Sequence, residues 1–569
     1  MRRRRPARRR SPLTPGLDWS ILQLIFERLD ADSVLFVLVN CNLLRMLRAP
    51  IYVGFVCIST VLLVDCGGAG VSHSQAPPLS ITTSALIDGM VAFPYSQTIQ
   101  ATGGVAPLVW SVSSGNLPHN LNLGSGSNTA TVAGTPDTPQ TATFSVEVKD
   151  ARSQSAVQSY TVTINRTRLA QLQAVSGSLP AETIEIQGVS AGPFNPLSWQ
   201  QNTLNWVPDV RIPMLAAQIT GPWQNIGAPW PVQQSNGWLL FYGGWDGTST
   251  PNDRVYDVPT PDFLSFGTRS LIIDHGAFQH VNNVNVTRLS DGSMHMICTV
   301  LPGPTGLDKP AYFFSPDGGS TWNGSPAPYA AQATDVLTVT NDNDYPTSDY
   351  NGGNVLLWEN NAWTLYYSLG VWHAQAPANI SRATGADPLQ VESTGPVLDT
   401  NHYGNDVRKF NVEGKNWYLM ALYIVTTGDT NKDTNIVFFY SLSTDGLSFG
   451  EQTTLFRGAT ANDRFIVSLS FVVAGDSVLG VLYSGNPAGP CCAGQIFARW
   501  LQRSITITDS TGAQFVLRGG YGPDRQWFTL PSSGPIQGNI TVFAEDGITP
   551  LAKGTVNTSA GQAYRLTID

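Results

Sequence analysis

The sequence predicts an all-β protein built around a five-bladed β-propeller, preceded by a β-sandwich and followed by a small β region. One strand pattern recurs five times between residues 235 and 500, with copies roughly 55–70 residues apart. Each copy has an apolar strand, a polar turn, an aromatic-rich strand and a third strand that ends in a turn. Radial closure leaves such short antiparallel strands few exposed edges, so five copies predict five blades.

The strands of each copy follow from alternation of aromatic or β-branched residues with polar ones, bounded by Gly, Asn and Asp. The aromatic-rich second strands are expected at 238–244, 293–301, 362–370, 416–424 and 477–485. First strands are expected at 230–234, 285–289, 354–358, 407–412 and 466–473. Together they predict a propeller over residues 193–508.

Two turns after third strands carry a further signal. Residues 315–322 (SPDGGSTW) match the S-x-D-x-G-x-x-W Asp-box and resemble sialidase-type propellers, and residues 443–449 (STDGLSF) form a shorter relative. Ser315 and Asp317 are expected to bond the turn's own backbone, Gly318 and Gly319 to adopt positive φ, and Trp322 to cover the blade. The motif indicates architecture and supplies no mechanism.

The N-terminal residues 1–66 predict an export signal or anchor. Residues 50–64 are an uncharged apolar run of about 15 residues, the length of a signal-peptide core. Cys66-Gly67-Gly68 follows and resembles a bacterial lipoprotein signal, in which Cys66 is lipidated. Ordinary signal cleavage and an uncleaved anchor are the alternatives, and Met46 offers a later start. We expect an extracytoplasmic protein, secreted or lipid-anchored to a bacterial cell envelope, that meets the membrane only through this segment.

Residues 67–80 (GGAGVSHSQAPPLS) predict a short linker, and residues 81–164 a sandwich of short strands. Residues 101–104 (ATGG), 107–111 (PLVWS), 134–136 (GTP) and 144–150 (FSVEVKD) resemble the Ig-like modules of bacterial surface proteins. We expect no cofactor, although Asp88 and Asp150 of this module could hold Ca²⁺ through oxygen. Residues 165–192 are expected to be a connector.

Residues 509–569 are again strand-like and predict a small C-terminal β domain. The charge balance bears on partners: 13% of residues are charged and the net charge is −9. Phosphate recognition needs clustered Lys and Arg, so the sequence excludes nucleic acid as a partner. No pair of cysteines has metal-ligand spacing.

Candidate site residues come from the starts of the first strands, which meet at the axis of a propeller. Polar residues recur there: His280 and Asn283 in the second copy, Asp349 and Tyr350 in the third, and His402, Asp406 and Arg408 in the fourth. The fifth contributes Asp463 and Arg464. In the first copy Asp209 is the best candidate carboxylate and Asp246 the second. Together with Trp245 and Trp372, these residues predict one polar funnel.

The propeller resembles the five-bladed glycosidases of the arabinanase, β-xylosidase, levansucrase and invertase group, in glycoside hydrolase families 43 and 32. The resemblance implies hydrolysis of a polysaccharide by paired carboxylates, and Asp349, Asp406, Asp209 and Asp463 are the candidates. His280, Asn283, His402, Arg408, Arg464, Trp245, Tyr350 and Trp372 would bind the substrate. Asn283 stands where these enzymes often have Asp.

Three functions therefore remain open. The first is a glycoside hydrolase that acts on polysaccharide. The second is a surface lipoprotein that binds glycans through the same funnel without catalysis, because a carboxamide cannot transfer a proton. The third is a sialidase, which would need an arginine triad built from Arg408, Arg464 and one other residue.

Overall fold

A computed structural model describes residues 77–569 except 178, 221–223, 249, 251, 304–305, 344–352, 369–378, 401, 424–436, 458–461, 464, 488–492 and 532–533. The chain divides into units 1–74 and 75–569, and all described residues belong to the second. They are strands and turns apart from one short helix, α2 (Pro196–Gln200), and the 3₁₀ turn η2 (Ala333–Asp335). The all-β prediction is confirmed. No helix within these ranges is long and apolar enough to cross a membrane.

The first folded region is the expected β-sandwich. Its two four-stranded sheets have the orders β1-β3-β6-β5 and β2-β8-β7-β4. Alternate residues of β7, among them Phe144 and Val146, are buried against Trp110 and Tyr160, as a strand with one core-facing side requires. The strands are β1 (Ser80–Ile81), β2 (Gly89–Met90), β3 (Tyr95–Thr102), β4 (Val109–Gly115), β5 (Leu121–Ser125), β6 (Thr129–Gly134), β7 (Gln140–Lys149) and β8 (Ser155–Asn165).

The second region holds five sheets of three to five strands among the described residues, besides one two-stranded sheet. The first contains β12 (Ile226–Gln234), β13 (Gly237–Gly244), β14 (Arg254–Thr260), β15 (Ser270–Asp274) and β21 (Tyr329–Ala330); the second β16 (His280–Arg288), β17 (Met294–Leu301) and β18 (Lys309–Ser315). The third contains β23 (Val355–Glu359), β24 (Ala362–Ser368), β25 (Asn379–Asp387), β26 (Gln390–Asp399) and β22 (Thr338–Thr340). The fourth contains β27 (Tyr403–Val412), β28 (Lys415–Tyr423), β29 (Val437–Ser443) and β30 (Thr453–Arg457); the fifth β31 (Phe465–Ala474), β32 (Ser477–Asn486), β33 (Gln495–Leu501) and β11 (Trp206–Pro208).

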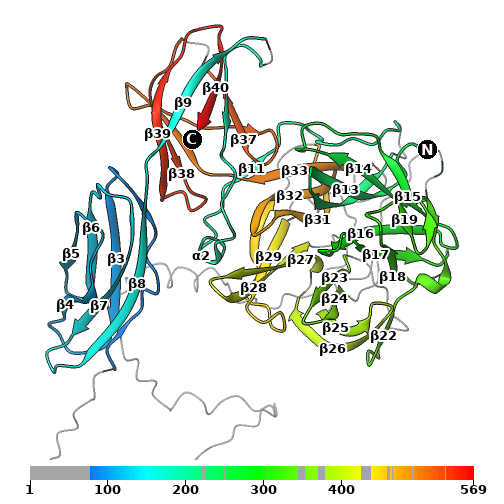
Figure 1. Cartoon of the computed structure of the whole chain (residues 1–569), viewed down its shortest axis with the longest axis horizontal. Helices are drawn as coiled ribbons and strands as arrows, with labels where there is room; N and C mark the ends of the chain where they lie inside the picture. Colours follow the sequence, from blue (N-terminus) through cyan, green and yellow to red (C-terminus); the bar gives the residue numbers. More distant parts are fainter. Residues whose placement is uncertain are drawn as a thin grey trace, which may run out of the picture. The chain divides into compact units, whose positions relative to one another are not determined.

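The first strands of these sheets surround a common axis. In chain order β12, β16, β23, β27 and β31 each contact the next, and β31 contacts β12, which closes the circle (Figure 1). Strand β11, which precedes the first sheet in the chain, pairs with β33 as the outer strand of the fifth. The chain that begins this region therefore completes its last sheet, and the fold is propeller-like.

The turn at 315–322 has the bonds that the sequence predicts. Asp317 Oδ1 accepts the Ser315 hydroxyl at 3.0 Å and the Thr321 N–H at 2.8 Å. Gly318 and Gly319 have φ of 71° and 102°, and Trp322 is fully buried. The turn at 443–449 repeats the pattern with Asp445. A small two-stranded sheet, β19 (Thr321–Trp322) and β20 (Ser325–Pro326), extends the first turn.

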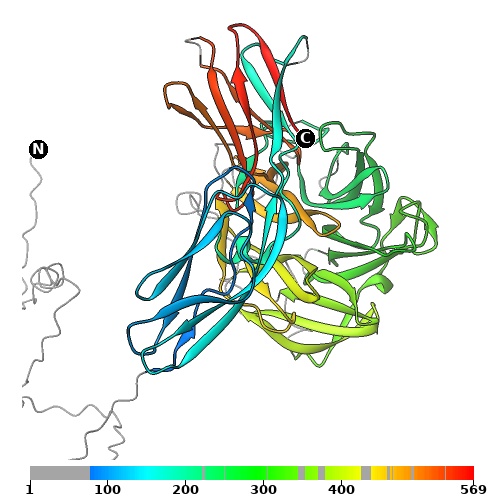
Figure 2. The same cartoon turned by 60° about the vertical axis from the view of Figure 1, so that its left-hand side comes forward.

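The third region shows that the expected connector is not a linker. Residues 165–192 contribute β9 (Arg168–Val175) and β10 (Thr183–Gln187) to the nine-stranded sheet that also contains the C-terminal strands. Figures 1 and 2 show cyan β9 among orange and red strands. The other strands are β34 (Ile505–Asp509), β35 (Gln514–Phe515), β36 (Gly519–Gly520), β37 (Arg525–Thr529), β38 (Gln537–Phe543), β39 (Pro550–Asn557) and β40 (Ala563–Ile568).

Long-range pairing is the physical reason for this correction. Strand β40 lies between β9 and β10, antiparallel to the first and parallel to the second, so neither strand has its partner nearby in sequence. The hydrophobic core of this third region brings Ile184 and Ile186 of β10 together with Ile540 and Leu566. The C-terminal domain is thus discontinuous, and the propeller-like region is inserted between its strands.

Candidate functional site at the propeller axis

Four of the first strands bend at the same place. Strands β12, β16, β27 and β31 each contain one extra residue relative to their second strands, which makes a β-bulge. Ala228, Asn283 and Ser468 stand at three of the bulges with φ of 47°, 55° and 43°, and Asn405 is the unpaired residue of the fourth. Left-handed backbone is costly for side chains other than glycine, and bulges of this kind are common beside functional sites.

Amide and hydroxyl side chains at and beside these bulges form hydrogen bonds between neighbouring sheets. We call these residues the axial collar: Asn282, Asn283, Thr299, Asn354, Asn405, Ser468 and Ser484. The Thr299 hydroxyl of β17 accepts Nδ2–H from Asn283 at 3.4 Å and from Asn354, which precedes β23, at 3.3 Å. The second and third sheets therefore share one hydroxyl group.

The collar continues through the other sheets. Asn405 Oδ1 accepts the Leu469 N–H at 3.1 Å, which links β27 to β31. The Ser468 and Ser484 hydroxyls accept the Ala228 N–H at 3.1 and 2.9 Å, which links the fifth sheet to the first. No carboxylate occupies any of the four bulge positions, so at the described bulges the collar offers amides and hydroxyls.

Asp406 lies directly after the Asn405 bulge and is fully buried. Arg408 Nε lies 2.8 Å from its Oδ1, and the Phe471 N–H donates to its Oδ2 at 2.8 Å. Burial raises the pKa of Asp406 to about 6, against the lowering effect of Arg408. The Arg408 guanidinium stacks 4.3 Å from the Trp230 ring centroid. Asp406 therefore lies on the inner strand β27, where it is held in an ion pair.

A second carboxylate, Asp253, was not among the residues expected from the sequence. Asn282 Nδ2 donates to its Oδ2 at 2.7 Å, and His280 Nδ1 lies 3.8 Å from the same oxygen. Its Oδ1 is buried without a hydrogen-bond partner in the described part of the chain. Burial raises the pKa of Asp253, while His280 and Asn282 lower it. Asn252 and Asp253 directly precede β14, and this residue pair is typical of a turn, so the sequence did not indicate a site there.

His280 is oriented by this cluster. The backbone N–H of Asp253 donates to His280 Nδ1 at 3.3 Å, so the proton of the neutral ring lies on Nε2. The His280 side chain is 29% exposed, and Asn282 and Asn283 are also partly exposed. Asn282 and Asn283 are therefore the solvent-accessible members of the collar, and His280 lies beside Asn282 at Asp253.

Three other predicted residues are engaged in structural contacts. Asp209 follows the outer strand β11, where Arg211 binds both of its oxygens and Trp500 Nε1 donates to Oδ2 at 2.8 Å. His402 Nδ1 lies 2.5 Å from Gln452 Oε1 beside β30, and burial lowers its pKa. Asp463 is buried and accepts the Tyr483 hydroxyl at 2.9 Å. Asp209 stands on an outermost strand, away from the inner strands that carry the collar.

The aromatic residues expected in the funnel do not provide an exposed platform where they are described. Trp245, the one of them that lies within the described residues, is only 5% exposed. Asp246, beside Trp245, accepts bonds from Tyr242 and Arg269. The remaining predicted residues, Asp349, Tyr350, Trp372, Arg464 and Cys66, lie outside the described residues.

The candidate calcium ligands cap turns. Asp150 accepts the backbone N–H groups of Val105, Arg152 and Gln154, and Asp88 accepts that of Thr163. Within the described ranges, no three His, Cys, Asp or Glu side chains gather as a metal site would require. The axial collar and its neighbours offer amides, hydroxyls, the His280 imidazole and the carboxylates of Asp253 and Asp406.

Comparison with known proteins identifies the first folded region. Residues 77–165 match the family model described as "Putative Ig domain", which agrees with the predicted sandwich. No curated protein matches the sequence.

Among solved structures, the chain is similar to a glycosyl hydrolase from Bacteroides ovatus (10% identity, 55% of this chain and 96% of that one, TM-score 0.38). It is also similar to a structure described for the GH130 family of mannoside phosphorylases, containing glycoside hydrolases that target β-1,2 mannosidic linkages in Candida mannan (10%, 52% and 93%, TM-score 0.36). A third is the Bombyx mori GH32 β-fructofuranosidase (9%, 66% and 95%, TM-score 0.36). Because these TM-scores lie below 0.5, we base no functional conclusion on them.

Proposed function

We propose that this protein is an extracytoplasmic carbohydrate-active protein whose five sheets are the blades of one propeller, and that its axial collar binds a glycan. The observation that carries this proposal is the run of amides and hydroxyls on the bulged inner strands. A carboxamide has both donors and acceptors, so it can bind a pair of neighbouring sugar hydroxyls. Asn282, Asn283 and His280 present such groups to solvent at one place.

Binding without hydrolysis is the function that the described residues favour. Glycoside hydrolysis requires two carboxylates about 5–9.5 Å apart, one of which transfers a proton. Asn283, Asn405 and Ser468 occupy the bulge positions, of which only that of Asn283 is partly exposed, and none of these side chains can transfer a proton in this way. Asp406 is fully buried and paired with Arg408.

Hydrolysis is a second candidate because of one observation at Asp253. Its side chain is 14% exposed, its pKa is raised by burial, and its Oδ1 is buried without a hydrogen-bond partner in the described ranges. A carboxyl group whose pKa is raised by burial is suited to act as a general acid. In this case Asp253 would protonate the leaving oxygen, and Asp349 is our candidate for the second carboxylate.

Sialidase activity is the least favoured alternative. Its arginine triad must bind the sugar carboxylate, yet the Arg408 guanidinium is engaged with Asp406, the Phe471 carbonyl and the Trp230 ring. A guanidinium with these contacts would have to give up an internal ion pair to bind a ligand.

The test uses Asn283→Gly, which removes the carboxamide and keeps a residue that tolerates positive φ. The matched control is Asn360→Gly, because Asn360 has φ of 51° in the turn between β23 and β24. Wild type and both variants are screened on a glycan array and on aryl glycosides, together with Asp253→Asn. We expect glycan binding without turnover, weakened by Asn283→Gly only. Turnover abolished by Asp253→Asn would establish hydrolysis, and binding of neutral glycans that Asn283→Gly leaves intact would refute the collar.

We also propose lipid attachment at Cys66, because the apolar run before it and the two glycines after it follow the lipoprotein pattern. Metabolic labelling with a fatty-acid analogue is expected to mark the wild-type protein and to miss Cys66→Ser. Equal labelling of both proteins would contradict this attachment.

A further inference from the structure

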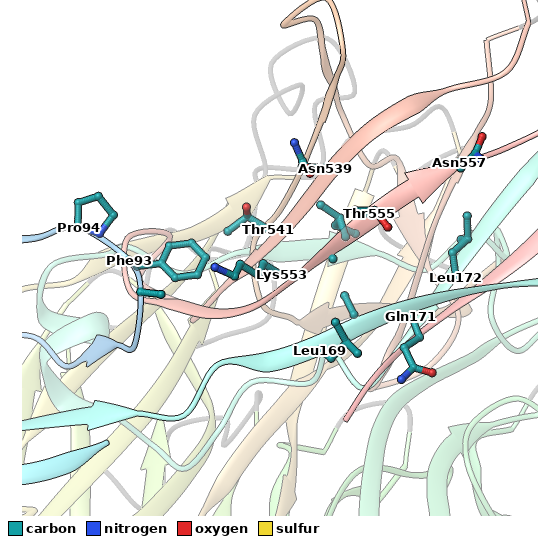
Figure 3. A pocket seen from close by; sticks show the side chains of 14 residues that line it. Phe93, Pro94, Leu169, Gln171, Leu172, Asn539, Thr541, Lys553, Thr555 and Asn557 are labelled. Carbon is teal, nitrogen blue, oxygen red and sulfur yellow. The ribbon is translucent and has the colours of Figure 1, made fainter. Parts of the chain in front are cut away.

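A cleft of about 970 Å³ lies on the outer face of the C-terminal sheet. Its floor is formed by β9, β38 and β39, and residues 92–94 of the Ig-like module form a wall (Figure 3). Ala92 in this wall has φ of 64°, and the Phe93 ring faces the Lys553 side chain. The cleft lies in a different sheet from the axial collar, so its ligand can be tested independently.

The pleat of the sheet places the floor side chains in rows. Thr541, Lys553 and Leu169 are register partners on β38, β39 and β9. Asn539 and Thr555 form the next row, two residues along each strand. Ile540, Ala552 and Ala170 alternate with these residues and are buried. The buried residues anchor the strands, and the strands place hydroxyl, amide and ammonium groups side by side on the exposed surface.

Apolar surface lies beside these polar rows. Leu169 is 50% exposed at the floor of the cleft, and Phe93 and Pro94 line its wall. A sugar ring has hydroxyl groups at its edge and C–H groups on its faces, so it needs both kinds of contact. A mixed lining of this type is characteristic of small-ligand sites, in which a few polar groups orient the ligand.

The charge of the cleft is opposite to that of the protein. Its lining includes Lys553 and no carboxylate, although the whole chain has a net charge of −9. Lys553 Nζ lies 4.9 Å from the Phe93 ring centroid, and it has no ion-pair partner among the described residues. An aromatic ring therefore positions this ammonium group without neutralising it, and the charge remains available to an anionic ligand.

We propose that this cleft binds an acidic oligosaccharide, one that contains uronic acid residues. Lys553 binds the uronate carboxylate, Asn539 and Thr555 bind hydroxyl groups, and Leu169 and Phe93 contact the apolar face of a ring. The proposal does not depend on what the axial collar binds.

The experiment is a calorimetric titration of the full-length protein with three uronate hexasaccharides: oligogalacturonate, oligomannuronate and a glucuronic-acid-substituted xylan fragment. A neutral galactan hexasaccharide is the uncharged comparison. At least one uronate is expected to bind, with affinity that falls as salt is added. Lys553→Gln is expected to weaken that binding about tenfold, as for the loss of one charge-assisted hydrogen bond, and Lys553→Arg to retain most of it.

Lys415→Gln is the matched control, because Lys415 Nζ also lies 4.9 Å from an aromatic centroid, that of Trp417 on β28. A second pair of variants tests the polar rows: Asn539→Ala should weaken binding, and Gln537→Ala, two residues away on the same strand, should not. These positions are exposed, so the substitutions should leave folding unchanged. The proposal is overturned if none of the three uronates binds, if Lys553→Gln binds as wild type does, if the neutral galactan binds equally well, or if only Asn283→Gly abolishes binding.

Discussion

Replacing Arg408 with Met tests the electrostatics of the axis most directly. The change leaves Asp406 fully buried without its counter-ion, and Met fills part of the space that the arginine stem occupied. Breaking a buried pair by removing one partner costs about 3–5 kcal/mol, because the remaining charge stays desolvated. At about 2–4 °C per kcal/mol, the midpoint of thermal unfolding should fall by roughly 6–20 °C at pH 7.

The pH dependence distinguishes this effect from simple loss of packing. The folded-state pKa of Asp406, about 6, lies above the value of about 3.9 in an unfolded chain. Protonation of this group therefore stabilises the folded protein as the pH falls from 6 towards 3.9, and that stability is lost as the pH rises through 6. Without Arg408 the pKa rises further, so the deficit of Arg408→Met should be largest above pH 7 and smaller at pH 5.

Calorimetry or circular dichroism of wild type and variant at pH 5, 6 and 7.5 provides the measurement. The double variant Asp406→Asn/Arg408→Met is the control, because it removes both charges and keeps an acceptor for the Phe471 N–H. The double variant should recover a large part of the unfolding free energy that Arg408→Met loses. A deficit under about 1 kcal/mol, which is typical of exposed pairs, or a deficit equal at pH 5 and 7.5, would refute the reasoning.

Three further predictions concern stability. Asp317→Ala removes the acceptor for Ser315 and Thr321 and should cost about 1–2 kcal/mol in urea unfolding; glycan binding should not change, and a binding defect would contradict a purely structural role. Burial opposes ionisation of Glu359, but hydrogen bonds from Tyr418 and Lys409 outweigh it and hold its pKa below the usual value. The ionised Glu359 therefore stabilises the fold above about pH 4.3, and this stabilisation is lost on acidification. The difference in unfolding free energy between wild type and Glu359→Gln should shrink as the pH falls. A difference that stays constant with pH would exclude this linkage. Ala228→Gly relieves left-handed backbone at φ 47° and should raise the unfolding free energy by up to about 1 kcal/mol; a loss of stability would show that the bulge carries no strain.

The sequence predicts the second strands of the sheets closely, because their signal is local. Strand β28 (Lys415–Tyr423), for instance, begins and ends one residue before the strand predicted at 416–424. Period-two alternation and a nearby turn are sufficient for such a strand. The Ser315–Trp322 turn is predictable for the same reason, since Asp317 bonds only to residues within four positions.

The first strands begin four or five residues before their predicted starts in β12, β16 and β27. The missed residues include Gly, Asn and Pro in all three strands taken together, and these residue types indicate turns in a local sequence pattern. In the structure they continue the strand through a bulge, because the neighbouring sheet supplies their partners. The Leu469 N–H that reaches Asn405 is 64 residues away, so a local pattern cannot reveal it.

Asp209 shows the same limit for a site residue. Its partner Arg211 is close in sequence, but Trp500 and Gly522 come from the far end of the chain. The sequence around a carboxylate at the end of a strand looks the same whether the carboxylate faces the propeller axis or forms hydrogen bonds with an outer strand. Asp253 illustrates the reverse case, because only the contact with Asn282 and His280 distinguishes it from a turn residue.

Burial explains why amides rather than carboxylates suit the collar. Asn354 and Asn405 are 1% and 6% exposed, and each carboxylate in such a place would need a counter-ion to offset desolvation. Asp406 has one in Arg408, and the axis accommodates that pair by stacking the guanidinium on Trp230. Several adjacent carboxylates would also repel one another across the collar. Amides form hydrogen bonds with the bulged backbone without the desolvation of a charge and without mutual repulsion. Because amides stand in place of carboxylates, the bulges also lack groups that could transfer a proton. The stability of the bulged axis and the absence of acid–base chemistry at its described bulges therefore have one physical origin, which is why we favour binding over hydrolysis there.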